Sequence, residues 1–177
     1  MTAAGLAAVC EQIDLGRRRV VVECGSGYST IVLARLLRRC GGAVTSLEHS
    51  EAWARRVGAG IDAEGLGRTA RVLRAPLGPQ PLMRPGLRWY AQSALGALPE
   101  RIDLLLVDGP PAGEPGLEES RYPALPLLAG RLAPDAVVVL DDIDRAGEQR
   151  VLAAWQRETD YRFESLRPER IALGRRA

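Results

Sequence analysis

Residues 20–30 constrain the fold of this chain more than any other part of the sequence. The segment opens with three consecutive valines, a run that is too short for a helix and typical of a buried strand in a parallel sheet. Glu23 ends the predicted strand, and Gly25 and Gly27 follow it. Ser29 can then cap a helix, because its hydroxyl can accept a hydrogen bond from a free backbone N–H of the first turn. The segment therefore predicts a strand, a glycine turn and a helix N-terminus, which together form a cradle where the backbone can approach a ligand closely.

Two classes of cofactor bind at such a turn. The dinucleotide fingerprint G-x-G-x-x-G/A ends on a small residue, whereas this chain has Thr30 there, and Glu23 would repel a nearby pyrophosphate. An acid before the glycines suits a cofactor that carries positive charge, as S-adenosylmethionine does on its ammonium and sulfonium groups. The E-x-G-x-G arrangement of residues 23–27 resembles the first motif of class I S-adenosylmethionine-dependent methyltransferases. Taken alone, the motif leaves NAD or FAD binding open as the alternative.

The resemblance implies that S-adenosylmethionine contacts the turn and the first residues of the helix. The cofactor-binding residues implied are Glu23, Gly25, Ser26, Gly27, Tyr28 and Ser29. A second acid, Glu48, ends the next predicted strand 21 residues beyond Gly27, which suits an acid that binds the two hydroxyls of an adenosine ribose. That spacing fits a dinucleotide equally well. His49, the only histidine, is expected to line the adenine side of the cofactor or to cap the following helix rather than to act as a base.

Composition and charge bound the class of protein. A chain of 177 residues is expected to form one domain, residues 1–177, that buries about 70% of its unfolded surface. The formal net charge is +2, from 24 basic and 22 acidic residues, so no strong field would draw the chain to nucleic acid or to a membrane. Each of the 24 basic residues is an arginine, and the absence of lysine and asparagine removes lysine as a general base and asparagine as a ligand.

The cysteines and the apolar runs bear on the compartment. Cys10, Cys24 and Cys40 are odd in number and lack the spacing of a metal site, which is typical of reduced thiols in a cytoplasmic protein. The sequence shows no signal-peptide pattern and no apolar run of about 18 residues. We therefore expect a cytoplasmic protein without a membrane partner.

The rest of the sequence alternates between helix and strand patterns. Helix patterns cover residues 3–13, 50–63, 93–98, 123–132 and 146–158, besides the helix that follows the glycine turn. Strand patterns cover residues 43–47, 69–73, 102–107 and 136–140, and a hairpin-length loop joins two more at 161–165 and 169–173. These units predict an α/β fold, a Rossmann-like, doubly wound and mostly parallel sheet that ends in an antiparallel hairpin. The hairpin resembles the end of the seven-stranded methyltransferase fold, whose seventh strand inserts antiparallel beside the fifth.

Acids also follow the strands 102–107 and 136–140. Asp108 begins the first of these turns, and Asp141 and Asp142 begin the second. Open α/β sheets bind their ligands at the carboxyl ends of parallel strands, so these acids are expected at the site. With them the resemblance to methyltransferases covers nearly the whole chain. The motifs that carry it are Glu23-Cys24-Gly25-Ser26-Gly27, Glu48, Asp108-Gly109-Pro110-Pro111, Asp141-Asp142 and the hairpin. Two further segments resemble those of a subgroup of small bacterial methyltransferases, namely Tyr28-Ser29-Thr30 and Arg121-Tyr122-Pro123.

The resemblance also implies a metal site at these two strand ends. Methyltransferases of the catechol O-methyltransferase kind hold a magnesium ion with three oxygen ligands. Residue by residue, Asp108 matches the first ligand, Asp141 the second and Asp142 the third, which is commonly asparagine in those enzymes. Carboxylates suit Mg²⁺ or Ca²⁺, and the ion would lower the pKa of an acceptor hydroxyl, with Asp108 and Asp142 as catalytic residues. The alternative is that Asp108 accepts a hydrogen bond from the cofactor and Asp142 caps the next helix.

Two long loops are expected to form the acceptor side of the site. In the loop 75–92, Trp89 and Tyr90 either pack under the loop or stand at a substrate mouth. In the loop 112–122, Arg121 either pairs with an acidic group of the acceptor or packs as the cap of the following helix, with Tyr122 beside it. A lid is expected from these loops or from the second subunit of a homodimer.

The sequence thus predicts an S-adenosylmethionine-dependent methyltransferase that acts on a hydroxyl of a small molecule, with Mg²⁺ assistance as an option. The first alternative is a catalytically silent protein of this fold that binds S-adenosylmethionine. The second is an NAD-type oxidoreductase, which Glu23 and Thr30 disfavour. Other chemistries lack their motifs, since no D/N-P-P-Y, G-x-S-x-G, G-K-[ST] or H-E-x-x-H pattern occurs.

Overall fold

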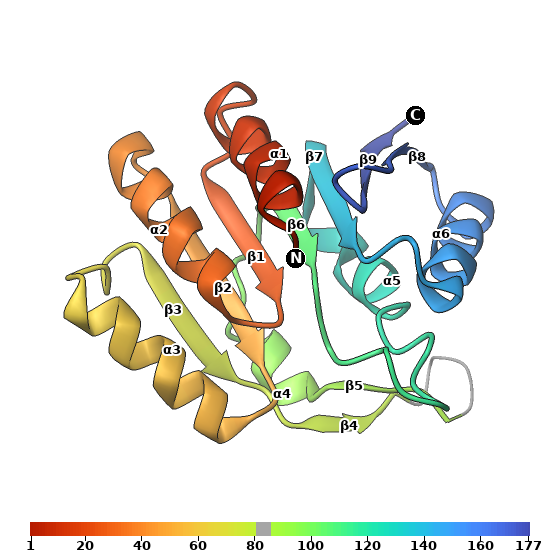
Figure 1. The fold of residues 1–177 in the computed structure, drawn as a ribbon, viewed down its shortest axis with the longest axis horizontal. Helices are drawn as coiled ribbons and strands as arrows, with labels where there is room; N and C mark the ends of the chain where they lie inside the picture. The colour runs from red at the N-terminus through yellow and green to blue at the C-terminus, as the bar shows by residue number, and fades with distance from the viewer. Residues whose placement is uncertain (81–85) are drawn as a thin grey trace.

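A seven-stranded sheet crosses the middle of the molecule, and helices pack on both of its faces (Figure 1). The computed structural model describes residues 1–80 and 86–177. The strands, in their order across the sheet, are β3 (Ala70–Arg74), β2 (Ala43–Glu48), β1 (Val20–Cys24), β6 (Ile102–Val107), β7 (Leu132–Asp141), β9 (Ile171–Arg176) and β8 (Tyr161–Leu166). β9 is antiparallel to both of its neighbours, and the pairs from β3 to β7 are parallel. The predicted fold, including the inserted antiparallel strand, is confirmed.

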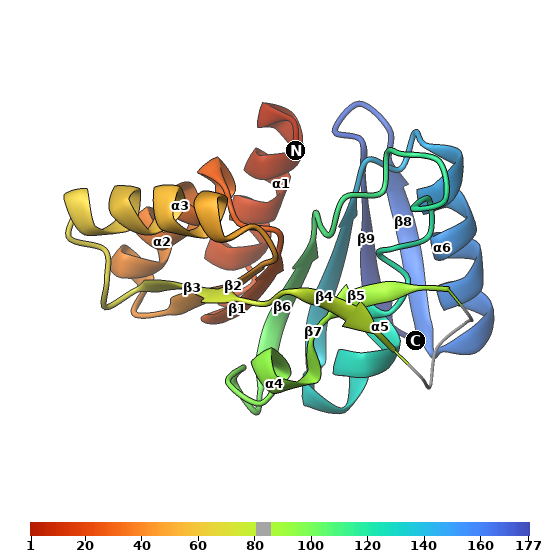
Figure 2. The same ribbon diagram turned by 90° about the horizontal axis from the view of Figure 1, so that it is seen from below.

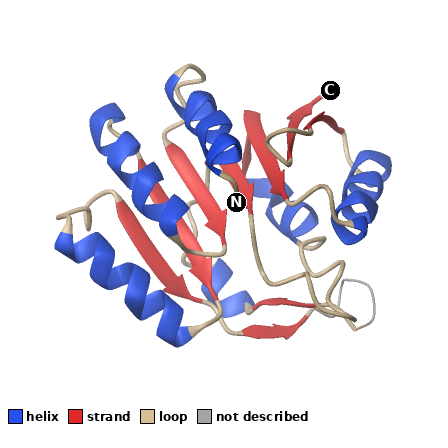
Figure 3. Ribbon diagram, viewed as in Figure 1, coloured by secondary structure: helices blue, strands red, loops and turns tan. Residues whose placement is uncertain are grey.

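The helices form two layers that enclose the sheet (Figure 2). One layer consists of α1 (Ala3–Asp14), α2 (Tyr28–Cys40) and α3 (Glu51–Ala63), and the other of α4 (Gln92–Leu95), α5 (Ala124–Leu128) and α6 (Ala146–Glu158). Successive side chains of a strand point to opposite faces, so Val21 packs with the first layer and Val22 with the second. Both faces of β1 are covered, which is why its apolar run is continuous rather than alternating. Helices and strands alternate along most of the chain (Figure 3).

The first turn of α2 differs from the prediction. The helix begins after Gly27, whose N–H donates to the hydroxyl of Thr30 at 2.9 Å. The prediction that Ser29 caps this helix is wrong, because the Ser29 hydroxyl donates to the carboxylate of Glu23 instead. The helix ends at Cys40, and Gly41 follows it in the left-handed region with a φ of 75°.

The segment 75–92 contains more regular structure than its prolines and glycines indicate. β4 (Leu77–Pro79) and β5 (Arg88–Tyr90) pair antiparallel, and the Gln80 side-chain amide donates to the carbonyl oxygen of Tyr90 at 2.9 Å. The prediction of an irregular loop is therefore wrong for these two arms. Residues 81–85 of the predicted loop lie outside the described residues.

Two predicted helices are shorter in the structure. The helix expected at 93–98 is reduced to the single turn of α4. The helix expected at 123–132 divides into α5 and a short 3₁₀ helix (Ala129–Arg131), because Leu132 already belongs to β7 and pairs with Ile102 in the sheet. Tertiary pairing with the sheet thus overrides a local helical pattern here.

Within residues 1–80 and 86–177, no helix has both the length and the apolar character that a membrane crossing requires.

Candidate active site

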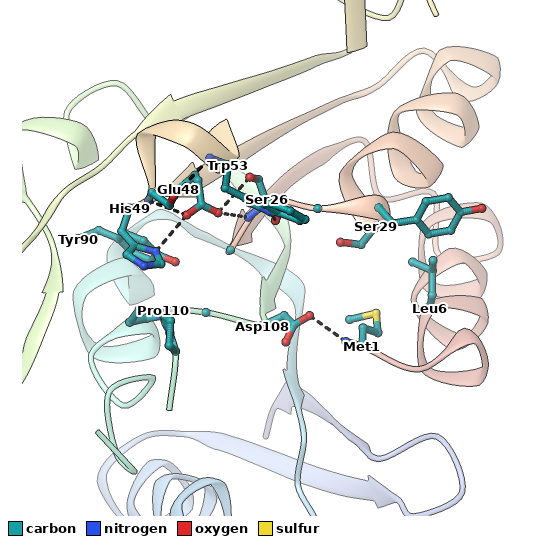
Figure 4. A pocket seen from close by; sticks show the side chains of 16 residues that line it. Met1, Leu6, Ser26, Ser29, Glu48, His49, Trp53, Tyr90, Asp108 and Pro110 are labelled. Atoms are coloured by element: carbon teal, nitrogen blue, oxygen red, sulfur yellow. Dashed lines mark hydrogen bonds and ion pairs between the residues drawn. The ribbon is translucent and has the colours of Figure 1, made fainter. Parts of the chain in front are cut away.

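The strand order places a crevice at the carboxyl ends of β1 and β6. β1 pairs with β2 on one side and with β6 on the other, so the chain connections diverge at this point, where open α/β sheets bind their ligands. A cavity of about 550 Å³ lies there (Figure 4). Its wall contains all of the predicted cofactor-binding residues except Glu23: Gly25, Ser26, Gly27, Tyr28, Ser29, Glu48, His49 and Asp108.

Two glycines keep the floor of this cavity open. Gly25 has a φ of 90°, and a Cβ there would lie 2.9 Å from the carbonyl oxygen of Asp108. Glycine adopts this φ without strain and lets the turns after β1 and β6 approach each other this closely. A Cβ on Gly27 would meet nothing within 4 Å, so the space beside this residue is free for a ligand.

Glu23 lies beneath α2 and outside the cavity wall. Its side chain is fully buried, and its carboxylate accepts hydrogen bonds from Ser29, from Thr30 at 2.5 Å and from Ser46 at 2.5 Å. Burial raises the pKa of Glu23, and the hydroxyl donors act in the opposite direction. The expectation that Glu23 faces the charged end of a cofactor is therefore corrected: the residue ties β1 to α2 and β2.

Glu48 lines the cavity at the end of β2. Its Oε2 accepts hydrogen bonds from the backbone N–H of Ser26 at 3.1 Å and from the Ser26 hydroxyl at 3.0 Å. Its Oε1 accepts from the Ser50 N–H at 2.8 Å and lies 3.0 Å from Nδ1 of His49 (Figure 4). These contacts fix the orientation of the carboxylate at the wall, in the place predicted for an acid that binds ribose hydroxyls.

The other predicted acids converge toward the far end of the same cavity. One carboxylate oxygen from each of Asp108, Asp141 and Asp142 lies within 4.8 Å of the others. Asp108 lines the cavity, whereas Asp141 and Asp142 are buried and do not. Burial and repulsion by Asp141 raise the pKa of Asp108 to about 7. The amino group of Met1 lies 3.1 Å from Oδ2 of Asp108 and 3.0 Å from Oδ2 of Asp141.

Arg121 lies among these acids. Its side chain is 4% exposed, and Nη2 donates to Oδ2 of Asp142 at 3.1 Å and to Oδ1 of Asp108 at 3.3 Å. Nη1 donates to the carbonyl oxygen of Asp141 at 3.1 Å. Because these contacts enclose the guanidinium, both expectations for it are wrong: its side chain neither faces an acceptor nor caps the following helix.

These cations decide whether the three acids fit a divalent metal. Carboxylates alone suit Mg²⁺. Here, however, guanidinium groups already contact two of the three predicted ligands: Arg121 lies beside Asp108 and Asp142, and Arg145 lies 2.8 Å from Asp142. The convergence of the acids is confirmed, but with these cations in place the set does not fit a divalent metal.

Of the three aromatic residues predicted to contact the substrate, two do not line the cavity and one does. Trp89 is fully buried in the core and absent from the cavity wall, so it packs under the loop. Tyr122 packs against α6, where its hydroxyl donates to Glu158 at 2.5 Å, and it does not line the cavity either. Tyr90 is also fully buried, but its side chain forms part of the cavity wall beside Gly109.

The cavity wall also contains Met1, Leu6, Ser50 and Trp53, which the sequence does not indicate as site residues. Met1 and Leu6 reach it because α1 packs beside α2, which no local pattern indicates. Trp53 is 43% exposed, and its indole N–H donates to the carbonyl oxygen of Ser26 at 2.7 Å. The sequence feature that could have indicated Trp53 is its position in the first turn of the helix that follows Glu48, because this turn lies beside the end of β2.

A family model described as a methyltransferase domain matches residues 22–143, more than half of the chain. The chain belongs to this family. The match spans the glycine turn, Glu48 and all three converging aspartates, so the methyltransferase resemblance of these motifs is confirmed. No curated protein matches the sequence significantly.

Solved structures of methyltransferases share the fold over the whole chain. The SAH-bound methyltransferase PaMTH1 of Podospora anserina is 15% identical with a TM-score of 0.74, and the match covers 100% of this chain and 80% of that one. The O-methyltransferase of Bacillus cereus in complex with SAH is 18% identical with a TM-score of 0.72, covering 100% and 82%. TomG of Streptomyces achromogenes, an O-methyltransferase in complex with SAM, is 18% identical with a TM-score of 0.67, covering 100% and 81%.

Proposed function

We propose that this methyltransferase transfers the methyl group of S-adenosylmethionine (SAM) to a hydroxyl oxygen of a small molecule. The observation that carries the proposal is one cavity with Glu48 in one part of its wall and Asp108 in another, in a chain of the methyltransferase domain family. The structural neighbours in complex with SAH or SAM, two of them named O-methyltransferases, support the cofactor and the oxygen acceptor.

The cavity offers matching groups to each part of the cofactor. SAM supplies a methyl group that its sulfonium charge has already activated. Glu48 can accept hydrogen bonds from the ribose hydroxyls, and His49 beside it faces the adenine side. The backbone of residues 25–29 receives the amino-acid part, because the space at Gly27 is open and the N-terminus of α2 favours a carboxylate.

The acceptor must be aligned, shielded from water and relieved of its proton. Asp108 is the converging aspartate that borders the cavity, so its carboxylate is placed to accept the proton of an acceptor hydroxyl. Asp142 was expected to share this catalytic role. It does not border the cavity, and its contact with Arg121 gives it a supporting role.

The charge and size of the site favour a small acceptor. The net charge of +2 provides no basic track for a phosphate backbone, so nucleic acid is not expected as substrate. A cavity of about 550 Å³ is in the range of small-molecule sites. Arg121, which could have recognised an acidic acceptor, is already enclosed by the chain's own carboxylates.

A methyl-transfer panel tests this proposal. The purified protein is incubated with SAM labelled on its methyl group and with phenols, sugars, amines, thiols, tRNA, DNA and protein. We expect label on hydroxylated small molecules, and Asp108→Asn should lower kcat by about 100-fold or more, the scale of a positioned general base. Labelling of a macromolecule alone would reject the acceptor class. SAH binding without turnover on any acceptor would indicate the catalytically silent alternative.

A further inference from the structure

Three arginines surround the carboxylate of Asp142. Its Oδ2 lies 3.1 Å from Nη2 of Arg121 and 2.8 Å from Nη1 of Arg145, and its Oδ1 lies 3.1 Å from Nη2 of Arg170. Both oxygens are therefore engaged by guanidinium groups. An aspartate in this setting is a poor metal ligand, because an ion would have to displace the guanidinium groups that already contact both of its oxygens.

Arg121 is the buried member of these three arginines. Its side chain is 4% exposed, against 40% for Arg145 and 39% for Arg170. Glu148 of α6 is fully buried, and its Oε1 lies 3.6 Å from Nη1 of Arg121. Removing Arg121 would leave this carboxylate with Arg145, at 4.0 Å, as the nearest cation among the described residues.

The guanidinium of Arg121 also joins the ends of two strands. At the end of β6 it donates to the carbonyl oxygen of Asp108 at 3.4 Å and to Oδ1 of Asp108 at 3.3 Å. At the end of β7 it donates to the carbonyl oxygen of Asp141 at 3.1 Å and to Oδ2 of Asp142 at 3.1 Å. The planar, five-donor guanidinium suits this task, whereas a lysine ammonium or a metal ion could not reproduce the same contacts.

A divalent ion would enter a cluster whose carboxylates already have guanidinium partners. The carboxylates of this cluster are those of Asp108, Asp141, Asp142, Asp144 and Glu148, and among the described residues the guanidinium groups within 4.0 Å of them are those of Arg121, Arg145 and Arg170. Mg²⁺ would have to displace Arg121 from both Asp108 and Asp142. It would also add two positive charges beside Arg121, where burial strengthens their repulsion.

We propose that Arg121 is the permanent cation of the acceptor site, in the place of a divalent metal. It is a positioning residue that holds the carboxylate of Asp108 at the cavity wall, and methyl transfer proceeds independently of Mg²⁺. This inference rests on the proposed function for its catalytic part. Its metal-binding part concerns the folded protein alone and can be tested without an acceptor.

Melting temperatures test the metal-binding part. For the wild-type protein we expect values within about 1 °C of each other in EDTA and in millimolar Mg²⁺ or Mn²⁺, because no ion binds the native state. Arg121→Met frees Oδ1 of Asp108 and removes one of the two guanidinium groups beside Oδ2 of Asp142, so Mg²⁺ at ten times its Kd should raise the melting temperature of this variant by about 3–6 °C. Arg150→Met, which breaks an exposed pair with Glu119 at 2.9 Å, is the matched control and should show no metal response.

Arg121→Lys tests the positioning role in a variant that keeps the positive charge. Lysine cannot reach both strand ends at once, so we expect kcat to fall about tenfold or more. The KM for SAM should stay within about twofold, because Arg121 does not line the cavity. A lower melting temperature with unchanged kcat would reduce Arg121 to a structural role and overturn this part.

The opposite metal result would overturn the inference as a whole. If Mg²⁺ raises the melting temperature of the wild-type protein and Asp141→Asn abolishes the rise, the acids hold a metal and Arg121 does not replace it. Failure of the proposed function would look different, since the wild-type protein would then neither bind SAH nor transfer methyl groups, whatever its response to metals.

Discussion

Replacing Glu23 by alanine should damage the stability of the protein far more than its affinity for the cofactor. Glu23 sits where an acid facing the cofactor's positive charge would be expected, yet its carboxylate is fully buried and accepts hydrogen bonds from three hydroxyls. Glu48 has the opposite setting, since its carboxylate borders the cavity. The two substitutions Glu23→Ala and Glu48→Ala therefore separate a structural acid from a binding acid.

The contacts of Glu23 set the expected size of the effect. The hydroxyl oxygens of Thr30 and Ser46 lie 3.3 Å apart, so these two groups can form a hydrogen bond with each other once the carboxylate is gone. The Ser29 hydroxyl is then the main group that has lost its hydrogen-bond partner. An unsatisfied buried polar group costs about 1–3 kcal/mol, and the space left by the side chain adds about 1 kcal/mol. The free energy of unfolding should fall by about 2–4 kcal/mol, and the melting temperature by about 4–16 °C for a chain of this length.

Urea denaturation and calorimetric titration with SAH provide the two readouts. For Glu23→Ala we expect the stability loss above and an SAH Kd within about threefold of wild type, because the carboxylate does not reach the cavity. For Glu48→Ala we expect a Kd weaker by about 10- to 100-fold, the scale of a hydrogen bond to a charged group. Glu11→Ala, on the exposed surface of α1, controls for the loss of a charge. The reasoning is refuted if Glu23→Ala leaves the free energy of unfolding unchanged, or if it weakens SAH binding as much as Glu48→Ala does.

Two further predictions concern the cavity wall. Gly109→Ala should destabilise the protein by about 1–3 kcal/mol and weaken SAH binding, because its Cβ would lie 2.7 Å from the Tyr90 hydroxyl and 2.9 Å from Cα of Gly25. Gly58→Ala in α3, whose Cβ meets nothing within 4 Å, should instead stabilise it by about 0.5–1 kcal/mol, and equal unfolding midpoints for the two variants would contradict this account. SAH should alter the tryptophan fluorescence through Trp53, since Trp89 and Trp155 are fully buried and absent from the cavity wall. The response should therefore disappear in Trp53→Phe, and its survival would mean that SAH binds elsewhere or acts through the core.

The fold could be predicted because its signals are local. The continuous apolar runs of β1, β6 and β7 indicate strands covered on both faces, and the segments between them indicate helices. Parallel strands bring their carboxyl ends to one edge, so Glu48 and Asp108 could be placed at a common site from their positions after two strands. Local patterns gave a wrong prediction where pairing in the sheet decides the structure. Leu132, for example, continues a helical pattern in the sequence but pairs with Ile102 in the sheet.

The roles of Glu23 and Arg121 could not be predicted, because each depends on at least one partner that only the folded sheet brings beside it. Glu23 is turned away from the ligand by Ser46, a residue of β2 that lies next to it only once the sheet has formed. Arg121 is enclosed by the ends of β6 and β7, which converge only in the folded chain. A sequence pattern shows that an acid or an arginine lies near a site, but long-range partners decide whether its charge remains available to a ligand.

The central claim, that the crevice between β1 and β6 is a SAM site, is tested most directly by calorimetric titration of the purified protein with SAH and with NADH. The account predicts one SAH bound per chain and no measurable binding of NADH, since the glycine turn ends in Thr30 rather than a third small residue and the chain belongs to a methyltransferase domain family. NADH binding more tightly than SAH would contradict it.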